Sequence, residues 1–391
     1  MRRSTRPALL AITAALTAAA LAACTASAPT PRPTETRTPT STPRPTASSS
    51  PVAAIPWQPG ERTTDLATGL EAPWSAVPLP SGSTLISERD SGDVIERLPQ
   101  GGQRLAGTVP GVVHTGESGL LGLAVPTGSA PPYLYAYETT ADDNRVVRLP
   151  LTGVPGSYAL GAPEPVVTGI PKAANHDGGR IAFGPDGMLY ITAGDASQPD
   201  RAQDVASLGG KILRVTPEGN VPGDNPFPGS PVWSFGHRNP QGIGWDSHGT
   251  MWASEFGQNT WDELNIITPG SNYGWPAVEG IGGDPAYTDP VQQWSTDEAS
   301  PSGLAIVGDT IFIAGLGGER LWTVWSTDGH APVTAEAFFD GELGRLRDVV
   351  ARGDRIWLLT NDTDGRGDPG PGDDRLVEVP LTPADPARLP G

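Results

Sequence analysis

The sequence predicts an all-β fold, a six-bladed β-propeller of four-stranded antiparallel blades. Two observations support this: a high content of turn-forming residues, and a pattern that recurs six times. The 391 residues include 50 Gly and 43 Pro, interleaved with short apolar runs. Because Gly and Pro favour turns, this composition indicates many short strands rather than long helices.

Each copy of the repeat has a turn with Gly or Asp, a strand of alternating large apolar residues, a polar loop and a second strand with a different alternation. The copies begin at Ser81, Pro131, Asp186, His248, Gly308 and Gly353. Their spacing of about 45 to 62 residues is near the length of a propeller blade. The segments between copies leave room for two more strands in each blade, and closing the ring would remove exposed sheet edges. A two-sheet sandwich array would explain the number of strands but not the repeated strand–loop–strand signature.

The N-terminal segment resembles a bacterial lipoprotein signal. Arginines precede an apolar run that ends in Leu21-Ala22-Ala23-Cys24. We expect residues 1–23 to be removed and Cys24 to carry the lipid, which would place the protein outside the cytoplasm with only this anchor in the membrane. An ordinary secretory signal with an incidental cysteine is the alternative. Because Cys24 is the only cysteine, an intrachain disulfide is excluded.

The remaining chain divides by composition. Residues 24–54 are rich in Thr, Ser and Pro and predict a disordered tether. We assign residues 55–384 to the propeller and 385–391 to a short tail. The formal net charge of −18 makes nucleic acid an unfavourable partner, whereas acidic loops can hold calcium.

In a propeller, loops from all blades converge on one face, so unusual loop residues indicate a site there. His176, in "NHDGGR", could act as a general base or could simply be a loop histidine with satisfied hydrogen bonds. Arg238, in "GHRNPQG", and Arg345 and Arg347, in "GRLRDVV", could form a carboxylate or phosphate site if they meet. Alternatively, each arginine pairs with a nearby acidic residue. A catalytic triad or a zinc site has little support in the sequence.

Two acidic segments could bind a cation. "SEFGQNTWDELN", from Ser254, offers carboxylates together with flexible main-chain carbonyls, the mixed oxygen shell that calcium takes; a solvated acidic loop is the alternative. "NDTDGRGDPGPGDD", from Asn361, places Asp362 and Asp364 ahead of Gly365 and resembles a calcium loop only loosely. We expect this second segment to be a mobile surface loop, with its Arg366-Gly367-Asp368 triplet incidental.

Five segments in order, "GESGLLGLAV", "NHDGGRIAFGPDGMLYITAGD", "GHRNPQG", "DELNIITPGSNYGWP" and "GRLRDVV", resemble the soluble pyrroloquinoline quinone (PQQ)-dependent sugar dehydrogenases, the glucose/sorbosone dehydrogenase-like family and its aldose sugar dehydrogenase branch. The resemblance runs from about residue 57 to residue 379 and implies a six-bladed propeller that uses PQQ and Ca²⁺ to oxidise an aldose at C1. An external acceptor would take the electrons.

The resemblance also implies roles for individual residues. His176 matches the base that takes the proton of the C1 hydroxyl while hydride passes to the quinone, and Arg238 and Asn239 match the pair beside the reactive carbonyl. The other implied cofactor contacts are Glu117, Trp294, Arg345 and Arg347. Gly257 and Gln258 match a turn whose carbonyls bind the cofactor's calcium, and Glu263 and Tyr273 match a structural calcium site.

One position departs from the family pattern. Relatives usually carry a lysine or arginine after the leucine of the segment that matches "AGLGGERLW", and here that residue is Gly317. The loss of this cation slightly favours an alternative function, a non-catalytic propeller that binds a sugar or a partner. A calcium-dependent hydrolase or lactonase is a further alternative, because other six-bladed propellers bind calcium in the channel.

Overall fold

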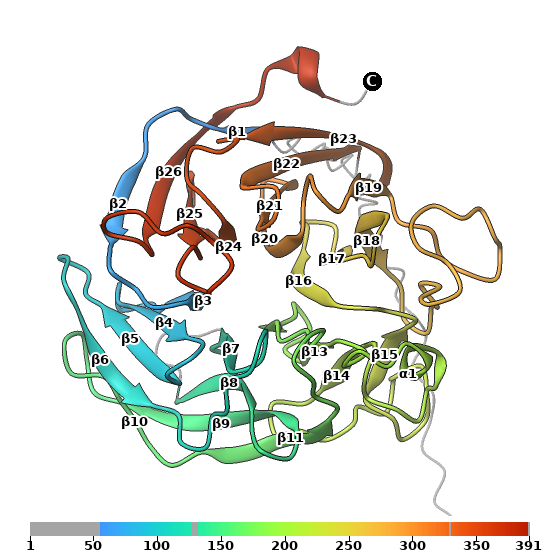
Figure 1. Cartoon of the computed structure of the whole chain (residues 1–391), viewed down its shortest axis with the longest axis horizontal. Helices are drawn as coiled ribbons and strands as arrows, with labels where there is room; N and C mark the ends of the chain where they lie inside the picture. Colours follow the sequence, from blue (N-terminus) through green and yellow to red (C-terminus); the bar gives the residue numbers. More distant parts are fainter. Residues whose placement is uncertain (1–54, 127–131, 328–329, 390–391) are drawn as a thin grey trace, which may run out of the picture. The chain divides into compact units, whose positions relative to one another are not determined.

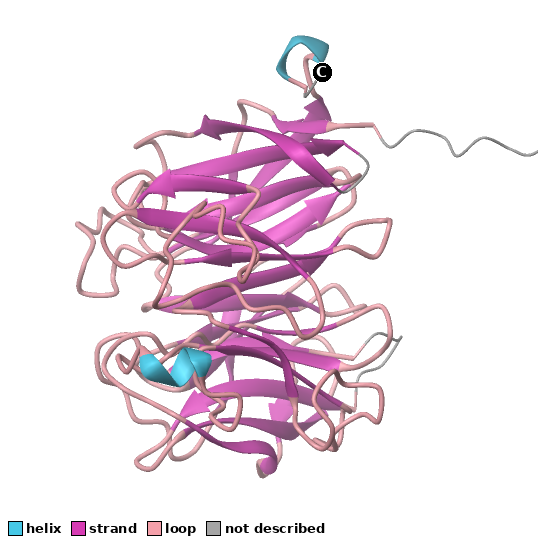
Figure 2. Cartoon of the chain, turned by 90° about the vertical axis from the view of Figure 1, so that its right-hand side faces the viewer, coloured by secondary structure: helices cyan, strands magenta, loops and turns pink. Residues whose placement is uncertain are grey.

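The computed structural model describes residues 55–126, 132–327 and 330–389. The predicted signal, the tether and Cys24 therefore lie outside the described residues. Within the described part the chain forms six antiparallel sheets around one axis, and sequence order follows the ring once (Figure 1). Among the described residues, regular structure is almost entirely strand, as Figure 2 shows, and the only helices are α1 (Asp200–Gln203) and a 3₁₀ turn (Pro386–Arg388). In these residues no helix is long and apolar enough to cross a membrane.

The first three blades follow the copies that begin at Ser81, Pro131 and Asp186. The first contains β3 (Pro73–Pro78), β4 (Thr84–Glu88), β5 (Asp93–Arg97) and β6 (Gln103–Thr108). The second contains β7 (Leu120–Ala124), β8 (Tyr133–Thr139), β9 (Asn144–Thr152), β10 (Ala159–Leu160) and β11 (Glu164–Ile170). The third contains β12 (Ile181–Phe183), β13 (Leu189–Ala193), β14 (Lys211–Val215) and β15 (Val232–Phe235).

The other three blades follow the copies that begin at His248, Gly308 and Gly353. The fourth contains β16 (Pro240–Trp245), β17 (Met251–Glu255), β18 (Trp261–Ile267) and β19 (Gln292–Ser295). The fifth contains β20 (Pro301–Val307), β21 (Thr310–Gly315), β22 (Arg320–Thr327) and β23 (His330–Phe338). The sixth contains β24 (Leu346–Ala351), β25 (Arg355–Thr360) and β26 (Leu376–Pro383), with β1 (Trp57–Pro59) and β2 (Thr64–Ala67). The predicted fold is confirmed.

The sixth blade closes the ring with both ends of the domain. Strand β26 pairs with β2, Thr64 lying opposite Glu378, and with β1, Trp57 lying opposite Pro383. The indole of Trp325 also donates to the carbonyl of Trp57 at 2.8 Å, which ties β1 to the fifth blade. Pairing of the first and last strands therefore covers the edge that an open sheet would expose.

The core lies between neighbouring sheets, because each blade buries large side chains against the next. One cluster joins Trp252, Leu264 and Trp294 of the fourth blade to Ile313 and Trp322 of the fifth. The innermost strands of successive blades, β3, β7, β12, β16, β20 and β24, contact one another around the ring. Residues that immediately precede these inner strands are therefore brought together at one end of the central axis.

Candidate functional site

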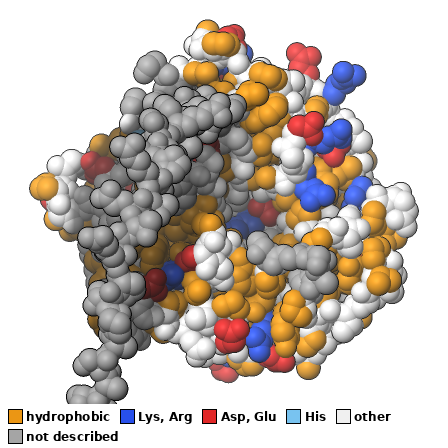
Figure 3. All heavy atoms as spheres, turned by 180° about the vertical axis from the view of Figure 1, so that it is seen from behind, with side chains coloured by type: hydrophobic (Ala, Val, Ile, Leu, Met, Phe, Trp, Pro, Cys, Tyr) orange, Lys and Arg blue, Asp and Glu red, His pale blue; other side chains and the backbone are white. Residues whose placement is uncertain are grey.

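Helix α1 marks the face of the propeller that Figure 1 presents to the viewer, and five of the predicted site residues lie in loops that lead into the innermost strands. Glu117 precedes β7, His176 precedes β12, Arg238 and Asn239 precede β16, and Arg345 immediately precedes β24. Each is thus in the loop that enters the innermost strand of its blade. On the opposite face, hydrophobic side chains lie among charged ones of both signs (Figure 3).

His176 is held between an aspartate and an arginine. Its Nδ1 lies 2.7 Å from Oδ1 of the buried Asp195, and its Nε2 lies 2.7 Å from a guanidinium nitrogen of Arg238. Because an ionised carboxylate can only accept and a guanidinium can only donate, Nδ1 carries the proton and Nε2 presents its lone pair. Burial lowers the pKa of Arg238 from its ordinary value, and Asp195 and Glu117 oppose that shift.

The backbone around His176 is tightly constrained. His176 has a φ of 62°, in the left-handed region that disfavours most side chains. Its carbonyl packs on Gly194, where an added Cβ would lie 2.0 Å from the His176 oxygen. Gly194 therefore cannot carry a side chain without displacing His176, and Asp195 directly follows Gly194 in the chain.

Glu117 and Asn239 connect His176 to the fourth blade. One carboxylate oxygen of Glu117, Oε2, accepts from the main-chain N–H of His176 at 3.0 Å and from Nδ2 of Asn239 at 3.2 Å. Asn239 Oδ1 in turn accepts from the N–H of Gly178 at 2.9 Å. Glu255 accepts from the main-chain N–H groups of Arg238 and Asn239 and so holds their loop. The structure thus brings four of the predicted residues, Glu117, His176, Arg238 and Asn239, into one hydrogen-bonded group.

Arg345 and Arg347 share one buried carboxylate. The shortest nitrogen-to-Asp364 distances are 3.1 Å from Arg345 and 3.7 Å from Arg347, and Arg89 also lies 3.9 Å away. Burial acts to raise the pKa of Asp364, but Arg345 and Arg347 outweigh it, so the pKa of Asp364 lies below its ordinary value. Arg89 is paired with Asp90 at 2.7 Å, so Arg345 and Arg347 share Asp364 between them and leave a local excess of positive charge in a protein that is acidic as a whole.

A cavity of about 210 Å³ is lined by three of these residues, Glu117, Arg345 and Arg347, whereas His176, Arg238 and Asn239 are not part of its wall. Its walls include Trp74, Glu117, Gln241, Phe256, Ser300, Leu316, Gly317, Arg345, Arg347 and Arg366. Trp294, which we expected to pack on the cofactor plane, does not line it: this side chain is 3% exposed and packs on Trp322, with the ring centroids 5.2 Å apart. The alternation of β19 turns Trp294 into the core between blades, and Trp74 and Phe256 are the aromatic residues of the cavity wall.

The main-chain N–H groups of the turn at Gly257 and Gln258 point toward the carboxylates of Glu279 and Asp262. Oε1 of Glu279 accepts the main-chain N–H groups of residues 258 to 261 at 2.6 to 3.2 Å, and Asp262 accepts the N–H of Gly257. No donor among the described residues bonds the carbonyl oxygens of Gly257 and Gln258. The Gln258 side chain accepts two hydrogen bonds from Arg238, at 2.6 and 2.8 Å.

Glu263 and Tyr273 lie deeper in the same blade. Burial, reinforced by the charge of Glu255 opposite it on β17, raises the pKa of Glu263 well above its ordinary value. The hydroxyl of Tyr273 is already engaged, donating to the carbonyl of Ile266 at 2.6 Å and accepting from the N–H of Thr268 at 2.9 Å. Only the main-chain carbonyl of Tyr273 is left to serve as a ligand.

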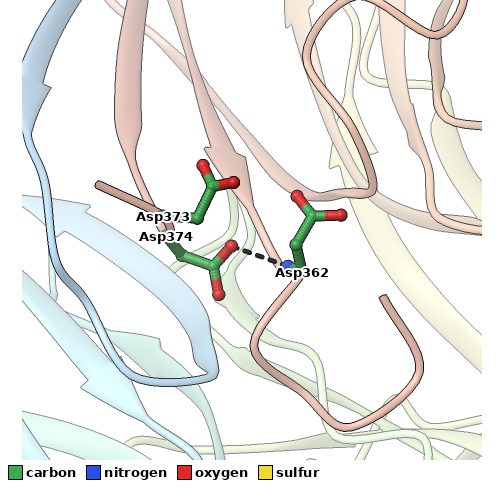
Figure 4. Close-up of side chains that lie close together, drawn as sticks. All are labelled: Asp362, Asp373 and Asp374. Atoms are coloured by element: carbon green, nitrogen blue, oxygen red, sulfur yellow. Dashed lines mark hydrogen bonds between the residues drawn. The ribbon is translucent and has the colours of Figure 1, made fainter. Parts of the chain in front are cut away.

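The loop from Asn361 to Asp374 differs from the expected surface loop, because Asp362, Asp364 and Asp374 are buried. Figure 4 shows Asp362, Asp373 and Asp374 close together, with Asp374 accepting from the main-chain N–H of Asp362 at 2.6 Å. Asp374 also accepts from Thr360 and twice from Thr363, so this carboxylate folds the loop. The loop resembles a calcium site in composition, but its carboxylates are used as internal acceptors.

Sequence reasoning missed two residues of this site, Asp195 and Arg366. Asp195 ends the segment "NHDGGRIAFGPDGMLYITAGD", and its relation to His176 appears only once β12 and β13 pair. The triplet that contains Arg366 looks incidental in the sequence, but the structure places Arg366 in the cavity wall; the signal that could have found it is a lone arginine between two glycines in a long loop.

Comparison with known proteins agrees with this geometry. The family model described as glucose/sorbosone dehydrogenase matches residues 70–368. The aldose sugar dehydrogenase YliI of Escherichia coli is 29% identical over 341 residues, covering 76% of this chain and 89% of that protein. The quinoprotein glucose dehydrogenase B of Acinetobacter calcoaceticus is 32% identical over 242 residues, covering 53% of this chain and 51% of that protein.

Solved structures of the same kind are also similar. The PQQ-bound aldose sugar dehydrogenase of Streptomyces coelicolor superposes with a TM-score of 0.79 at 50% identity, covering 83% of this chain and all of that one. A glucose dehydrogenase-like oxidoreductase of Thermus superposes with a TM-score of 0.75 at 43% identity, covering 82% of this chain and all of that one.

Proposed function

Since the chain belongs to the glucose/sorbosone dehydrogenase family and is a PQQ-dependent sugar oxidoreductase, we propose that it oxidises aldoses at C1 with His176 as the general base. The observation that carries this proposal is the pair of contacts that fix His176, Nδ1 to Asp195 and Nε2 to Arg238. They leave a neutral imidazole with its lone pair on the nitrogen next to a buried cation. The two other functions left open by the sequence would not require this arrangement beside the arginines.

The residues of the cavity fit PQQ, a flat tricarboxylate. Arg345 and Arg347 offer guanidinium groups that Asp364 neutralises only in part, and Trp74 and Phe256 offer apolar ring surfaces. Guanidinium groups are suited to carboxylates because their planar N–H donors can bond both oxygens. PQQ, when bound, supplies the oxidant that accepts hydride from the sugar.

The protein's own groups would handle the proton and the developing charge. The Nε2 lone pair of His176 accepts the proton of the C1 hydroxyl as the carbon–oxygen double bond forms. Asp195 then stabilises the imidazolium through the bond to Nδ1–H. The guanidinium of Arg238 must move away from Nε2 of His176 to admit the sugar hydroxyl. In its new position it can stabilise negative charge that develops beside it. Glu117 and Asn239 hold the loops of His176 and Arg238 in their relative positions during this step.

We also propose calcium as the partner of PQQ. The carbonyl groups of Gly257 and Gln258 are the candidate ligands for it, because oxygen atoms of this kind suit Ca²⁺. A second calcium would be structural, next to Glu263 and the main-chain carbonyl of Tyr273. The facing carboxylates of Glu255 and Glu263 support this proposal, since a cation there would offset their repulsion.

The remaining elements of the proposal concern location. A lipid on Cys24 would hold the enzyme on the outer side of the cell membrane, and electrons would pass to an external acceptor. Metabolic labelling with a radioactive fatty acid tests the anchor: we expect label on the wild type and none on Cys24→Ser.

The test of the reaction uses chelator-treated protein titrated with PQQ, with and without Ca²⁺. We expect aldose-dependent dye reduction by the wild type only when both are added. The matched variant is His176→Asn, because Asn tolerates a left-handed φ far better than Ala does. We expect it to bind PQQ as the wild type does and to lose about 10²- to 10⁴-fold in kcat. Full activity of this variant would exclude His176 as the base.

A further inference from the structure

We propose that Arg366 is a further cofactor-anchoring residue, whose guanidinium binds a carboxylate of the quinone. This inference rests on the PQQ-dependent function given above. Arg366 lies in the long loop between β25 and β26, far in sequence from the other site loops except that of Arg345 and Arg347. It nevertheless lines the same cavity as both of those arginines.

The backbone on both sides of Arg366 is fixed. Its N–H donates to Oδ1 of Asp364 at 2.9 Å, and the other oxygen of Asp364 bonds Arg345. The next residue, Gly367, packs so closely that an added Cβ would lie 2.6 Å from Cα of Asp362 and 2.8 Å from Cδ of Arg345. The loop therefore holds Arg366 beside the Arg345 side chain, and only Gly at position 367 allows this approach.

The guanidinium of Arg366 has weak partners, in contrast to those of its neighbours. Its nitrogens lie 3.4 Å from Oε1 of Glu117 and 3.4 Å from Oδ1 of Asn175, and its side chain is 43% exposed. Charge-assisted N–H···O bonds are normally about 2.7 to 2.9 Å long. Arg347, by comparison, donates to Gln241 at 2.8 Å and is buried. Arg366 can therefore exchange its present contacts for an anion in the cavity at little cost.

Gly317, which also lines the cavity, supplies no charge to it. A Cβ at this position would lie 2.5 Å from Oγ of Ser300, so the wall there is made of small, neutral groups. A ligand with three carboxylates that meets Arg345 and Arg347 finds no charged partner at Gly317, whereas Arg366 lines the same cavity and carries a positive charge. We infer that Arg366 offsets the missing cation at position 317.

The contact with Glu117 predicts that Arg366 affects the binding of PQQ and not the proton transfer to His176. Arg366 contacts Oε1 of Glu117, whereas His176 and Asn239 are held by Oε2. When Arg366 turns to the cofactor, the bonds that position His176 can persist. Loss of Arg366 should therefore weaken PQQ binding and leave kcat at saturating PQQ within about twofold of the wild-type value.

The experiment measures the Kd of PQQ for the chelator-treated full-length protein with Ca²⁺ added, by isothermal titration calorimetry, for the wild type, R366Q, R366K and the double variant R366Q/G317K. We expect R366Q to raise Kd about tenfold or more, the value of one charged hydrogen bond. The Kd of R366K, which keeps the charge, should lie between those of the wild type and R366Q. In the double variant R366Q/G317K, the added lysine should restore part of the lost affinity. The control is R352Q, which removes an exposed arginine of the β24–β25 turn outside the cavity.

Each other outcome is decisive. A Kd of PQQ for R366Q within twofold of the wild-type value would overturn the inference, whether or not the melting temperature falls. Arg366 would then have only a structural bond to Glu117, and the proposed function would still stand because the wild type binds PQQ. If the wild type itself does not bind PQQ, the proposed function fails and this inference fails with it.

Discussion

Replacement of Asp195 by Asn is the sharpest test of how His176 is activated. Oδ1 of Asp195 accepts from Nδ1 of His176 and from the N–H of Ser197 at 2.8 Å, whereas Oδ2 accepts only from the indole N–H of Trp275 at 2.9 Å. An Asn side chain has one oxygen, so it must give up a bond on one side. It loses fewer bonds with its oxygen in the Oδ1 position and its amide facing Trp275. The Nδ1–H form of His176 is then preserved.

The expected loss follows from that orientation. Asp195→Asn keeps the tautomer but removes the negative charge that stabilises the imidazolium, and a hydrogen bond to a charged group contributes about 1.5 to 3 kcal/mol. At 1.4 kcal/mol for each factor of ten, kcat should fall about 10- to 150-fold. Most of this range lies below the 10²- to 10⁴-fold loss expected for His176→Asn.

The assay is steady-state dye reduction at saturating PQQ, Ca²⁺ and sugar, with the Kd of PQQ measured separately. We expect that Kd to stay within about twofold of the wild type, because Asp195 does not line the cavity. Asp200→Asn, an exposed aspartate in α1, is the control. A kcat for Asp195→Asn within threefold of the wild type would refute the reasoning, and so would a loss as large as that of His176→Asn.

Two further predictions concern stability. Burial raises the pKa of Glu138 from its ordinary value of 4.5 to about 7, so the native state binds this proton more tightly than the unfolded state, and the free energy of unfolding falls as pH rises from 4.5 to 7. Glu138→Gln should therefore stabilise the protein by about 2 to 3 kcal/mol at pH 8 and leave it unchanged near pH 4 in urea titrations; equal curves at pH 8 would contradict this. Gly194→Ala, whose Cβ would strike the His176 carbonyl, should cost about 1 to 3 kcal/mol and most of kcat, while Gly223→Ala, with open space around it, should change neither. An unchanged melting temperature for Gly194→Ala would show that the His176 loop can move to accommodate the added methyl group without loss of stability.

The fold was predictable because each blade repeats one pattern of alternation and turns. The closure of the sixth blade was not, since β1 and β2 are short and lack the repeat. His176, Arg238, Asn239, Arg345 and Arg347 could be found from unusual loop residues and from family resemblance. Asp195 and Trp294 could not be placed, because the direction in which a strand or loop side chain points depends on pairing register. The partners of Arg366 depend on how the loop after β25 folds back.

The joining of β2 to β26 also constrains how the protein is made. The two strands are about 310 residues apart in sequence, a contact of very high sequence separation that closes slowly. A chain still emerging from the ribosome or a membrane channel lacks β26, the strand that joins β1 and β2 to β25, so the ring stays open until nearly the last residues appear. Any chain cut short before residue 376 would share that defect, with β1 and β2 left without a partner strand. Joining the neighbouring ends and opening the ring at another turn should give a permuted chain in which these strands meet early.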